Sequence, residues 1–379
     1  MSIAGLLIRR ERLARGWSQE GLCRGICTAS YLSKIEQGRA EASDEVRGLL
    51  FARLGLSWTE DPDGALHART EECMEALLSG GGAAFRAAFE PLRAEEERFL
   101  GSPCAADYLL LRAFACENEG ERRSLDAEFV SFLDQRQLAL QCVLEERYEE
   151  AVRLYPAPVL RLWQGASLYA RGSYTAAIET LRAAYDAAAA EGFACIMMNS
   201  RVYLGNCYSD LGDFERMRRH YAVAQRLASA LGERETLAVI RYNTAATQIE
   251  RGDFAAAYAY FSALEEPGAI ALHKLAICCE ALGRREEAFA ALDRAEALLG
   301  SGDMVEREML ALVRYRLEHP DHLHDERYGA LLTGCFSRLR RERGAGYARF
   351  HLPWMLAWYK ANRQYRQACL LLEEFPEIK

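Results

Sequence analysis

Apolar residues recur every three or four positions along much of the chain, which is the spacing of one face of an α-helix. Runs of β-branched residues are few, and Ala, Leu, Arg and Glu dominate the composition, which favours helix almost everywhere. The pattern therefore predicts an all-α protein. Over the first sixty residues it predicts four short helices, at about 3–14, 19–25, 28–37 and 43–54.

The ends of these helices carry typical capping residues. Gly16 and Gly38 follow the first and third helices, where a residue without a β-carbon ends a helix most easily. Ser18, Thr28 and Ser43 precede the other three, where their side chains accept a hydrogen bond from the first turn. Two short helices across a tight turn, packed by flanking helices, predict a helix-turn-helix unit.

The third helix has an inner and an outer face. Leu32 and Ile35 are expected to face inward with Leu22 and Leu13. The outer face is small and polar, and its predicted DNA contacts are Thr28, Ala29, Ser30, Ser33 and Lys34. Small residues allow the helix backbone close to DNA, while hydroxyl and ammonium groups bond base edges and phosphates. Gln19, at the start of the preceding helix, is a further predicted phosphate contact.

A different pattern begins after "SWTEDPDG" (57–64), whose acids, Pro and Gly predict a linker. Four segments repeat a small residue, a Gly seven positions later and a second helical stretch: 165–184, 205–224, 245–264 and 276–295. The turn glycines are Gly172, Gly212, Gly252 and Gly283. Weaker copies at 139–155 and 356–375 suggest six or more units. The predicted domains are therefore 1–56, the linker 57–64, and a helical repeat domain over 65–379.

Stacked helix hairpins of this kind form a curved solenoid, because one hairpin cannot cover its own apolar face. The first helix of each hairpin lines the concave face. Counting back from each turn glycine gives the predicted groove residues: Trp163, Tyr169, Asn199, Tyr203, Asn206, Tyr242, Asn243, His273 and Lys274. Asn suits peptide binding because its amide both donates to and accepts from a backbone. Ordinary packing between helices remains the alternative role for each of these residues.

Charge divides the chain in the same way. Residues 1–39 carry seven Arg or Lys against three acids, a net charge of +4, so that the rest carries −12. An anionic partner is therefore expected only at the first predicted domain, residues 1–56, which we call the head. The twelve cysteines form no zinc-ligand pattern, and neither a signal peptide nor a membrane span is recognisable, so we expect buried, reduced thiols in a cytoplasmic protein. No metal, cofactor or membrane partner is predicted.

The head also contains recognisable sequence motifs. "WSQEGLCRGICTASYLSKIEQGR" resembles the lambda-repressor-like (Cro/C1-type, XRE) DNA-binding domain over about residues 3–56, and the array resembles the tetratricopeptide repeat. Their combination is similar to the Rgg/PlcR/PrgX type of peptide-pheromone-responsive regulators of Gram-positive bacteria. The resemblance implies a homodimeric, cytoplasmic transcription factor that binds double-stranded DNA. It also implies a short signalling peptide in the groove, with Asn199, Asn206 and Asn243 as candidates for binding its backbone.

Other functions are less well supported by the sequence. An enzyme is not expected, because "SGGGAAF" (79–85) lacks the Lys–Ser/Thr pair of a phosphate loop and more simply joins two helices. "HPDHLHDER" (319–327) is dense in His and Asp, but a solvated loop is the simpler interpretation, as is a solvated face for "RLRRER" (338–343). Two alternatives remain: a repeat adaptor acting on a phosphorelay or other partner without DNA, and a DNA-binding protein whose array only dimerises.

Overall fold

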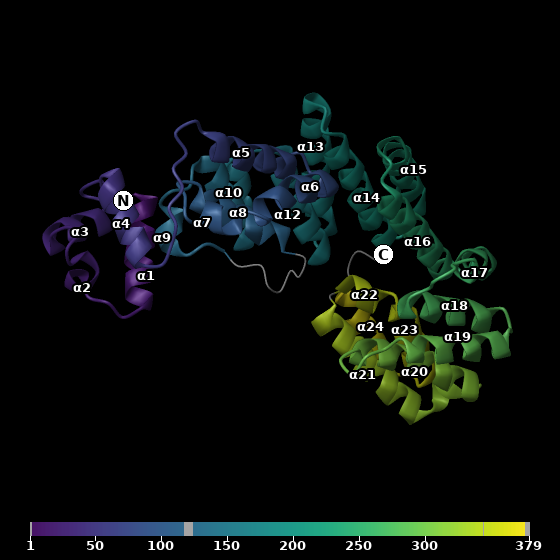
Figure 1. Ribbon diagram of the computed structural model, residues 1–379. Coiled ribbons are helices and arrows are strands. Elements are labelled where there is room, and N and C mark those ends of the chain that lie inside the picture. Colours follow the sequence, from purple (N-terminus) through teal and green to yellow (C-terminus); the bar gives the residue numbers. More distant parts are fainter. Residues whose placement is uncertain (1, 117–123, 344, 376–379) are drawn as a thin grey trace. The chain divides into compact units, whose positions relative to one another are not determined.

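The computed structural model describes residues 2–116, 124–343 and 345–375. Within them the chain forms 24 α-helices and no strand, which confirms the all-α prediction (Figure 1). Contacts divide the chain into two compact units, Met1–Gln164 with Ala183–Ile196, and Gly165–Arg182 with Met197–Lys379. The linker proposed at 57–64 lies inside the first unit, and the domain boundaries remain predictions. No described helix is long and apolar enough to cross a membrane.

The head begins the first unit with four short helices: α1 (Ile3–Ala14), α2 (Gln19–Cys23), α3 (Ala29–Glu36) and α4 (Asp44–Arg53). All three predicted N-caps are confirmed. Ser18 accepts a hydrogen bond from Gly21 N at 3.0 Å, Thr28 from Tyr31 N at 3.2 Å, and Ser43 from Val46 N at 3.3 Å. These caps fix where each helix starts, and so they fix which side chains α3 presents.

The core of the head contains the apolar residues that the helical spacing places inward. Leu22, Leu32 and Ile35 are fully buried. The inward prediction for Leu13 is wrong, because its surface is 55% exposed. Arg12 takes the inward position of that turn instead and pairs with the buried Glu36. Leu13 lies about 100° further round the helix and faces outward.

Seven helices follow the head in this unit: α5 (Ala65–Leu78), α6 (Gly82–Arg93), α7 (Glu96–Leu100), α8 (Ala105–Ala115), α9 (Ala127–Val130), α10 (Gln135–Leu144) and α11 (Tyr148–Leu154). The connection predicted at 79–85 is shorter than expected, because α6 begins at Gly82 and only 79–81 joins α5 to α6. The head packs against this group through α1. Leu6 is fully buried in a cluster with Ala105, Phe129 and Leu133.

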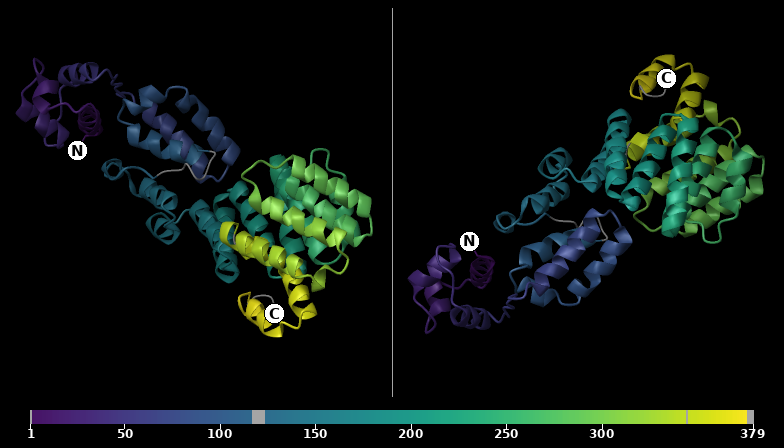
Figure 2. Two further views of the ribbon diagram at one scale, coloured as in Figure 1. Left: turned by 90° about the horizontal axis from the view of Figure 1, so that it is seen from below. Right: turned by 90° about the horizontal axis from the view of Figure 1, so that it is seen from above.

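The remaining helices continue the hairpins of the repeat. They are α12 (Pro158–Ala170), α13 (Tyr174–Glu191), α14 (Ala194–Asp210), α15 (Phe214–Leu231), α16 (Arg234–Glu250), α17 (Phe254–Ser262), α18 (Ala269–Ala281), α19 (Arg285–Ala297), α20 (Met304–Glu318), α21 (Glu326–Glu342), α22 (Ala345–Arg349), α23 (Leu352–Ala361) and α24 (Tyr365–Glu373). Figure 2 shows these helices, coloured from teal through green to yellow, from below and from above. The four turn glycines all have a positive φ, between 73° and 77°, which confirms them as helix-ending residues.

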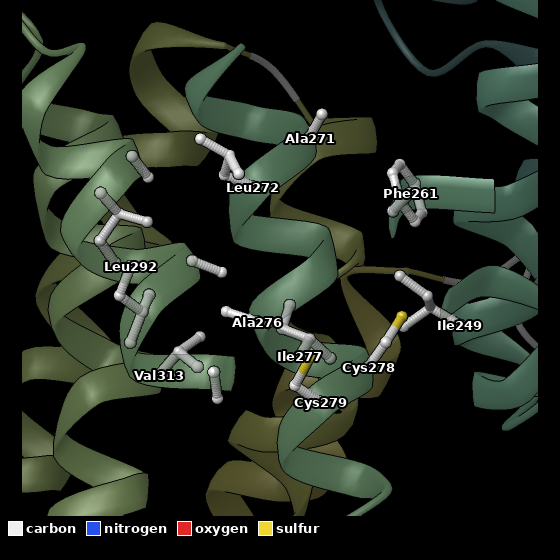
Figure 3. Close-up of a cluster of buried hydrophobic side chains, with 14 of the residues drawn as sticks. Ile249, Phe261, Ala271, Leu272, Ala276, Ile277, Cys278, Cys279, Leu292 and Val313 are labelled. Atoms are coloured by element: carbon white, nitrogen blue, oxygen red, sulfur yellow. The ribbon is translucent and has the colours of Figure 1, made fainter. Parts of the chain in front are cut away.

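The small residues of the repeat allow its helices to approach closely. A β-carbon on Gly205 would lie 2.2 Å from the ring of Tyr221, and one on Gly165 would lie 2.6 Å from Leu181. Ala276 is fully buried in the apolar cluster around α18, together with Ile277, Leu292 and Val313 (Figure 3). Hairpin packing therefore depends on these positions, as the repeat pattern predicts.

The cysteines serve mainly as packing residues. Cys278 and Cys279 are fully buried in the cluster of Figure 3, which confirms the packing role predicted for them. Cys369 departs from that prediction, because it is exposed on the C-terminal helix α24. The His- and Asp-rich stretch 319–327 joins α20 to α21 through a single 3-10 turn, as expected of a loop.

Candidate nucleic-acid interface and ligand groove

The outer face of α3 is polar and accessible. Thr28, Ser30 and Lys34 are exposed, while Ala29 and Ser33 are half-buried. All five predicted contacts of this helix are thus at least partly accessible. Their hydroxyls donate and accept hydrogen bonds, and the ammonium adds a charge, so the face suits base edges and phosphates.

A buried ion pair fixes α3 against α1. Arg12 Nε and Nη2 donate to the two carboxylate oxygens of Glu36 at 2.6 and 2.8 Å, and Arg12 Nη1 donates to the carbonyl of Trp17 at 2.7 Å. The hydrogen bonds that Arg12 donates to Glu36 raise the pKa of Arg12, so the guanidinium stays charged. Sequence reasoning missed this pair, although two opposite charges on the apolar faces of predicted helices are a readable signal.

The same carboxylate positions Gln19, the predicted phosphate contact. Gln19 Nε2 donates to Glu36 Oε2 at 2.8 Å, and its side chain is half-buried. Glu36 therefore connects α1, α2 and α3 through one buried group. This arrangement holds the start of α2 beside α3 in a defined geometry.

Further contacts restrict the orientation of α3. The hydroxyl of Tyr31 donates to the carbonyl of Glu41 at 2.8 Å. A β-carbon on Gly5 would lie only 2.3 Å from the carbonyl oxygen of Ile35, so α1 crosses α3 in direct backbone contact. Ser33 accepts a bond from Gln37 Nε2 at 3.1 Å and keeps its own proton for donation.

Not all of the positive charge of the head is available to an anion. Arg12 is neutralised by Glu36, and Arg10 pairs with Asp126 at 2.8 Å. Within the described part of the chain, Arg24, Lys34 and Arg39 are exposed and form no ion pair. The unpaired charge therefore lies on and around α3.

Four of the predicted groove residues meet in the second unit. The rings of Tyr169 and Tyr203 lie edge to face with centroids 5.9 Å apart. Asn206 Oδ1 accepts bonds from Asn243 Nδ2 at 3.1 Å and from the Tyr221 hydroxyl at 2.6 Å. These contacts join α12, α14 and α16 into one polar and aromatic surface.

The other predicted groove residues have varied positions. Asn199 is half-buried on α14, one turn before Tyr203, and Tyr242 packs edge-on against Phe261 at 5.6 Å. Trp163 belongs to the first unit, where it stacks on Phe114 at 5.6 Å. The ligand-binding role of each residue remains a prediction.

His273 and Lys274 lie beneath a C-terminal segment. They are only 1% and 7% exposed. Lys274 Nζ lies 2.8 Å from the ring centroid of Phe350, and His273 stacks on His351 at 6.2 Å. Burial lowers the pKa of Lys274 to about 7. A ligand would reach these two side chains only if residues 350 and 351 moved away.

The same segment places a charge in the polar surface. Arg349 Nη2 donates to the carbonyl of Ser209 at 3.2 Å and to Glu250 Oε2 at 3.3 Å. Burial raises the pKa of Asp210, while Arg349 and hydrogen bonds from Tyr174 and Tyr169 oppose the rise. Asp210 follows Asn206 by four residues, so helical spacing was a signal for it. Nothing in the sequence signals Arg349, which is 99 residues from Glu250.

Comparison with known families bears on the head. Residues 8–60 match the Helix-turn-helix family model. This match and the four helices confirm the predicted resemblance of the head to a Cro/C1-type helix-turn-helix domain. No curated protein matches the chain.

Two solved structures match much of the chain. The apo form of the quorum sensor NprR from B. thuringiensis matches with a TM-score of 0.52 at 17% identity, covering 82% of this chain and all of NprR. PlcR from Bacillus thuringiensis, in complex with the peptide PapR7 and DNA, matches with a TM-score of 0.33 at 12% identity, covering 63% of this chain and 99% of PlcR. The likeness to NprR establishes a common helical fold over the matched 82% of this chain, and the helix-turn-helix head rests on the family match.

Proposed function

We propose that the protein is a DNA-binding transcriptional regulator whose helical array binds a short signalling peptide or a protein segment. The DNA-binding part of this proposal rests on the outer face of α3. Thr28, Ser30 and Lys34 are exposed there, in a domain that matches a helix-turn-helix family. Such a helix enters the major groove with its first residues at the base edges. The buried pair of Arg12 and Glu36 supplies the rigidity that this contact needs.

The ligand half rests on the polar surface of the array. An extended peptide needs donors and acceptors for its backbone and area for its side chains, and Asn206, Asn243, Tyr169 and Tyr203 supply both. The fold shared with NprR, which is described as a quorum sensor, supports the same role. An array that only dimerised would not require this polar lining.

The head is joined to the rest of its unit in a way that suits signal transmission. Leu6 is buried against α8 and the segment around α9, and Arg10 adds a 2.8 Å ion pair to Asp126. Movement of these helices would therefore carry the head with it. In a cytoplasmic homodimer, two heads must lie about 34 Å apart to read successive turns of DNA. A ligand switches such a dimer only by binding one geometry better than another.

The DNA half is tested by fluorescence anisotropy with DNA taken from upstream of the protein's own gene. Ser30→Glu places a negative charge on the exposed face of α3, and we expect it to weaken binding at least about tenfold, from like-charge repulsion and lost contacts. Ala87→Glu is the matched control, because it adds the same charge at an exposed site on α6, outside the head. Specific binding should also weaken steeply with salt. Equal, weak binding by all three proteins would refute the DNA function and favour a protein-interaction adaptor.

The ligand half is tested separately with a library of synthetic heptapeptides bound to the full-length protein. Peptides that bind the proposed groove should lose affinity for Asn243→Ala but keep it for Gln225→Ala, a control on α15, outside the helices that carry the predicted groove residues. If no peptide distinguishes these two variants, the groove assignment is wrong even where DNA binding holds.

A further inference from the structure

Three side chains with metal-binding atoms converge where the segment 57–64 meets α5 and α8, and a fourth, Asp61, lies beside one of them, Cys104. Asp61 comes from that segment, His67 from the first turn of α5, and Cys104 and Asp107 from the start of α8. Cys104 and Asp107 are three residues apart, which puts both on one side of the helix start. Residues far apart in the sequence thus share one small region of the first unit.

The distances are close to those of a coordination shell. The donor atoms of His67, Cys104 and Asp107 all lie within 4.8 Å of one another, and His67 Nδ1 is 4.0 Å from Asp107 Oδ2. Cys104 Sγ is 4.0 Å from Asp61 Oδ2. Ligands of a tetrahedral zinc ion, with bonds of about 2.0–2.3 Å, lie roughly 3.3–3.8 Å apart. A small shift closes this gap, and it is easiest for His67, whose side chain is 61% exposed.

The polar partners of the group leave room for a cation. Cys104 is only 2% exposed, and Asp107 Oδ1 accepts a hydrogen bond from Gln137 Nε2 at 2.6 Å. Among the described residues, no Lys or Arg forms an ion pair with Asp61 or Asp107. The two carboxylates therefore accept hydrogen bonds from backbone N–H groups and from Gln137 but pair with no ammonium or guanidinium group.

Solvent reaches the group from one side. A cavity of about 560 Å³ is lined by His67 and Asp107, together with Asp134, Arg136 and Gln137. Arg136 pairs with Glu71 at 2.6 Å and is therefore already neutralised. An ion that enters through this cavity meets His67 and Asp107 first, because these two residues line it and the buried Cys104 does not.

We propose that Asp61, His67, Cys104 and Asp107 form a binding site for one divalent transition-metal ion, with Zn²⁺ as the expected ion. One imidazole nitrogen, one thiolate and two carboxylate oxygens make a four-donor set that suits zinc, because hard ions such as Mg²⁺ and Ca²⁺ prefer oxygen alone. On binding, the S–H bond of Cys104 breaks, the sulfur–zinc bond forms and the proton passes to solvent.

The site has a structural consequence that does not depend on DNA binding. Asp61 already caps α5, accepting hydrogen bonds from Leu66 N at 2.9 Å and His67 N at 3.0 Å. Thr59 N donates to the carbonyl of Gly101 at 2.7 Å in the same region. A metal ion bound by all four side chains would cross-link the segment that follows the head to both α5 and α8. The bound ion should therefore raise the melting temperature of the protein.

The test uses the full-length protein, stripped of metal with a chelator and titrated with Co²⁺, whose visible and near-ultraviolet spectrum reports thiolate coordination. We expect one equivalent to produce a sulfur-to-cobalt charge-transfer band, which Zn²⁺ then displaces. Cys104→Ser should abolish the band, and His67→Ala should weaken Zn²⁺ binding at least about tenfold. Binding should release a proton and raise the melting temperature.

Two matched variants separate the site from other thiols and imidazoles. Cys73→Ser removes another fully buried cysteine, on α5, and His324→Ala removes another exposed histidine; both should leave binding unchanged. If Cys104→Ser does not fold, His67→Ala still decides, because its exposed side chain contributes little to packing. No saturable binding would overturn the proposal, and so would binding that Cys104→Ser and His67→Ala both retain.

Discussion

Replacing Glu36 by Gln is expected to destabilise the head strongly. The substitution keeps the shape of the side chain but leaves the Arg12 guanidinium without its counter-ion in a site where the two side chains are only 10% and 3% exposed. The two hydrogen bonds from Arg12, at 2.6 and 2.8 Å, no longer have a charged acceptor. The hydrogen bond from Gln19 loses its charged acceptor as well. Breaking a buried pair from one side costs about 3–5 kcal/mol, because the remaining charge stays buried.

Hydrogen exchange measured by mass spectrometry is the suitable assay, because it gives the opening free energy of the head within the intact chain. Peptides from α1 and α3 should exchange faster, by the factor that corresponds to an opening free energy lowered by about 3–5 kcal/mol. Glu41→Gln, an exposed acid in the loop after α3, is the control and should stay within about 0.5 kcal/mol.

A double substitution tests whether the destabilisation comes from the buried charge that is left unpaired. Arg12→Met with Glu36→Leu removes both charges together and should recover much of the stability that Glu36→Gln loses. The reasoning is refuted if Glu36→Gln costs less than about 1 kcal/mol, or if the double variant is destabilised by the sum of its single changes.

Three further predictions concern the second unit. Gly205→Ala should lower the melting temperature, with a cost of about 1–3 kcal/mol, because its β-carbon meets a ring at 2.2 Å; Gly334→Ala, with open space around it in α21, should be neutral or stabilising. Arg349→Ala should speed hydrogen exchange in residues 347–354, because it breaks the bonds to Ser209 and Glu250 that hold this segment. Burial lowers the pKa of His351 from 6.5 to about 3, so the unfolded chain binds a proton that the folded chain does not. The contribution of His351 to stability should therefore be full above about pH 6.5 and fall by about 2 kcal/mol between pH 7 and pH 5, seen in urea titrations as a smaller fall in His351→Leu than in the unchanged protein.

Local signals made most of the fold predictable. Helical spacing, the N-caps Ser18, Thr28 and Ser43, and the four turn glycines each act within a few residues, so sequence alone locates the helices and their ends. The accessible polar residues of α3 follow from the same spacing. Leu13 is the exception. Helical spacing alone did not indicate that Arg12, paired with Glu36 on α3, would occupy the inward position that Leu13 was expected to fill.

Contacts between distant segments were not predictable. The burial of His273 and Lys274 depends on residues 350 and 351, which follow them by more than seventy positions. The partner of Glu250 is likewise Arg349, from the C-terminal segment. No periodicity within the repeat indicates that this later segment would cover α18. Pattern counting proposed the groove residues, but it did not reveal which of them the chain itself covers.

The most direct test of the central claim is hydrogen exchange of the full-length protein with and without its upstream DNA. We predict that peptides spanning residues 26–40 gain protection when the DNA is added, because α3 and its flanking turns then lie in the major groove. The gain should be absent with Ser30→Glu and present with Ala87→Glu. Saturable DNA binding that protects other parts of the chain and leaves residues 26–40 unchanged would contradict the account.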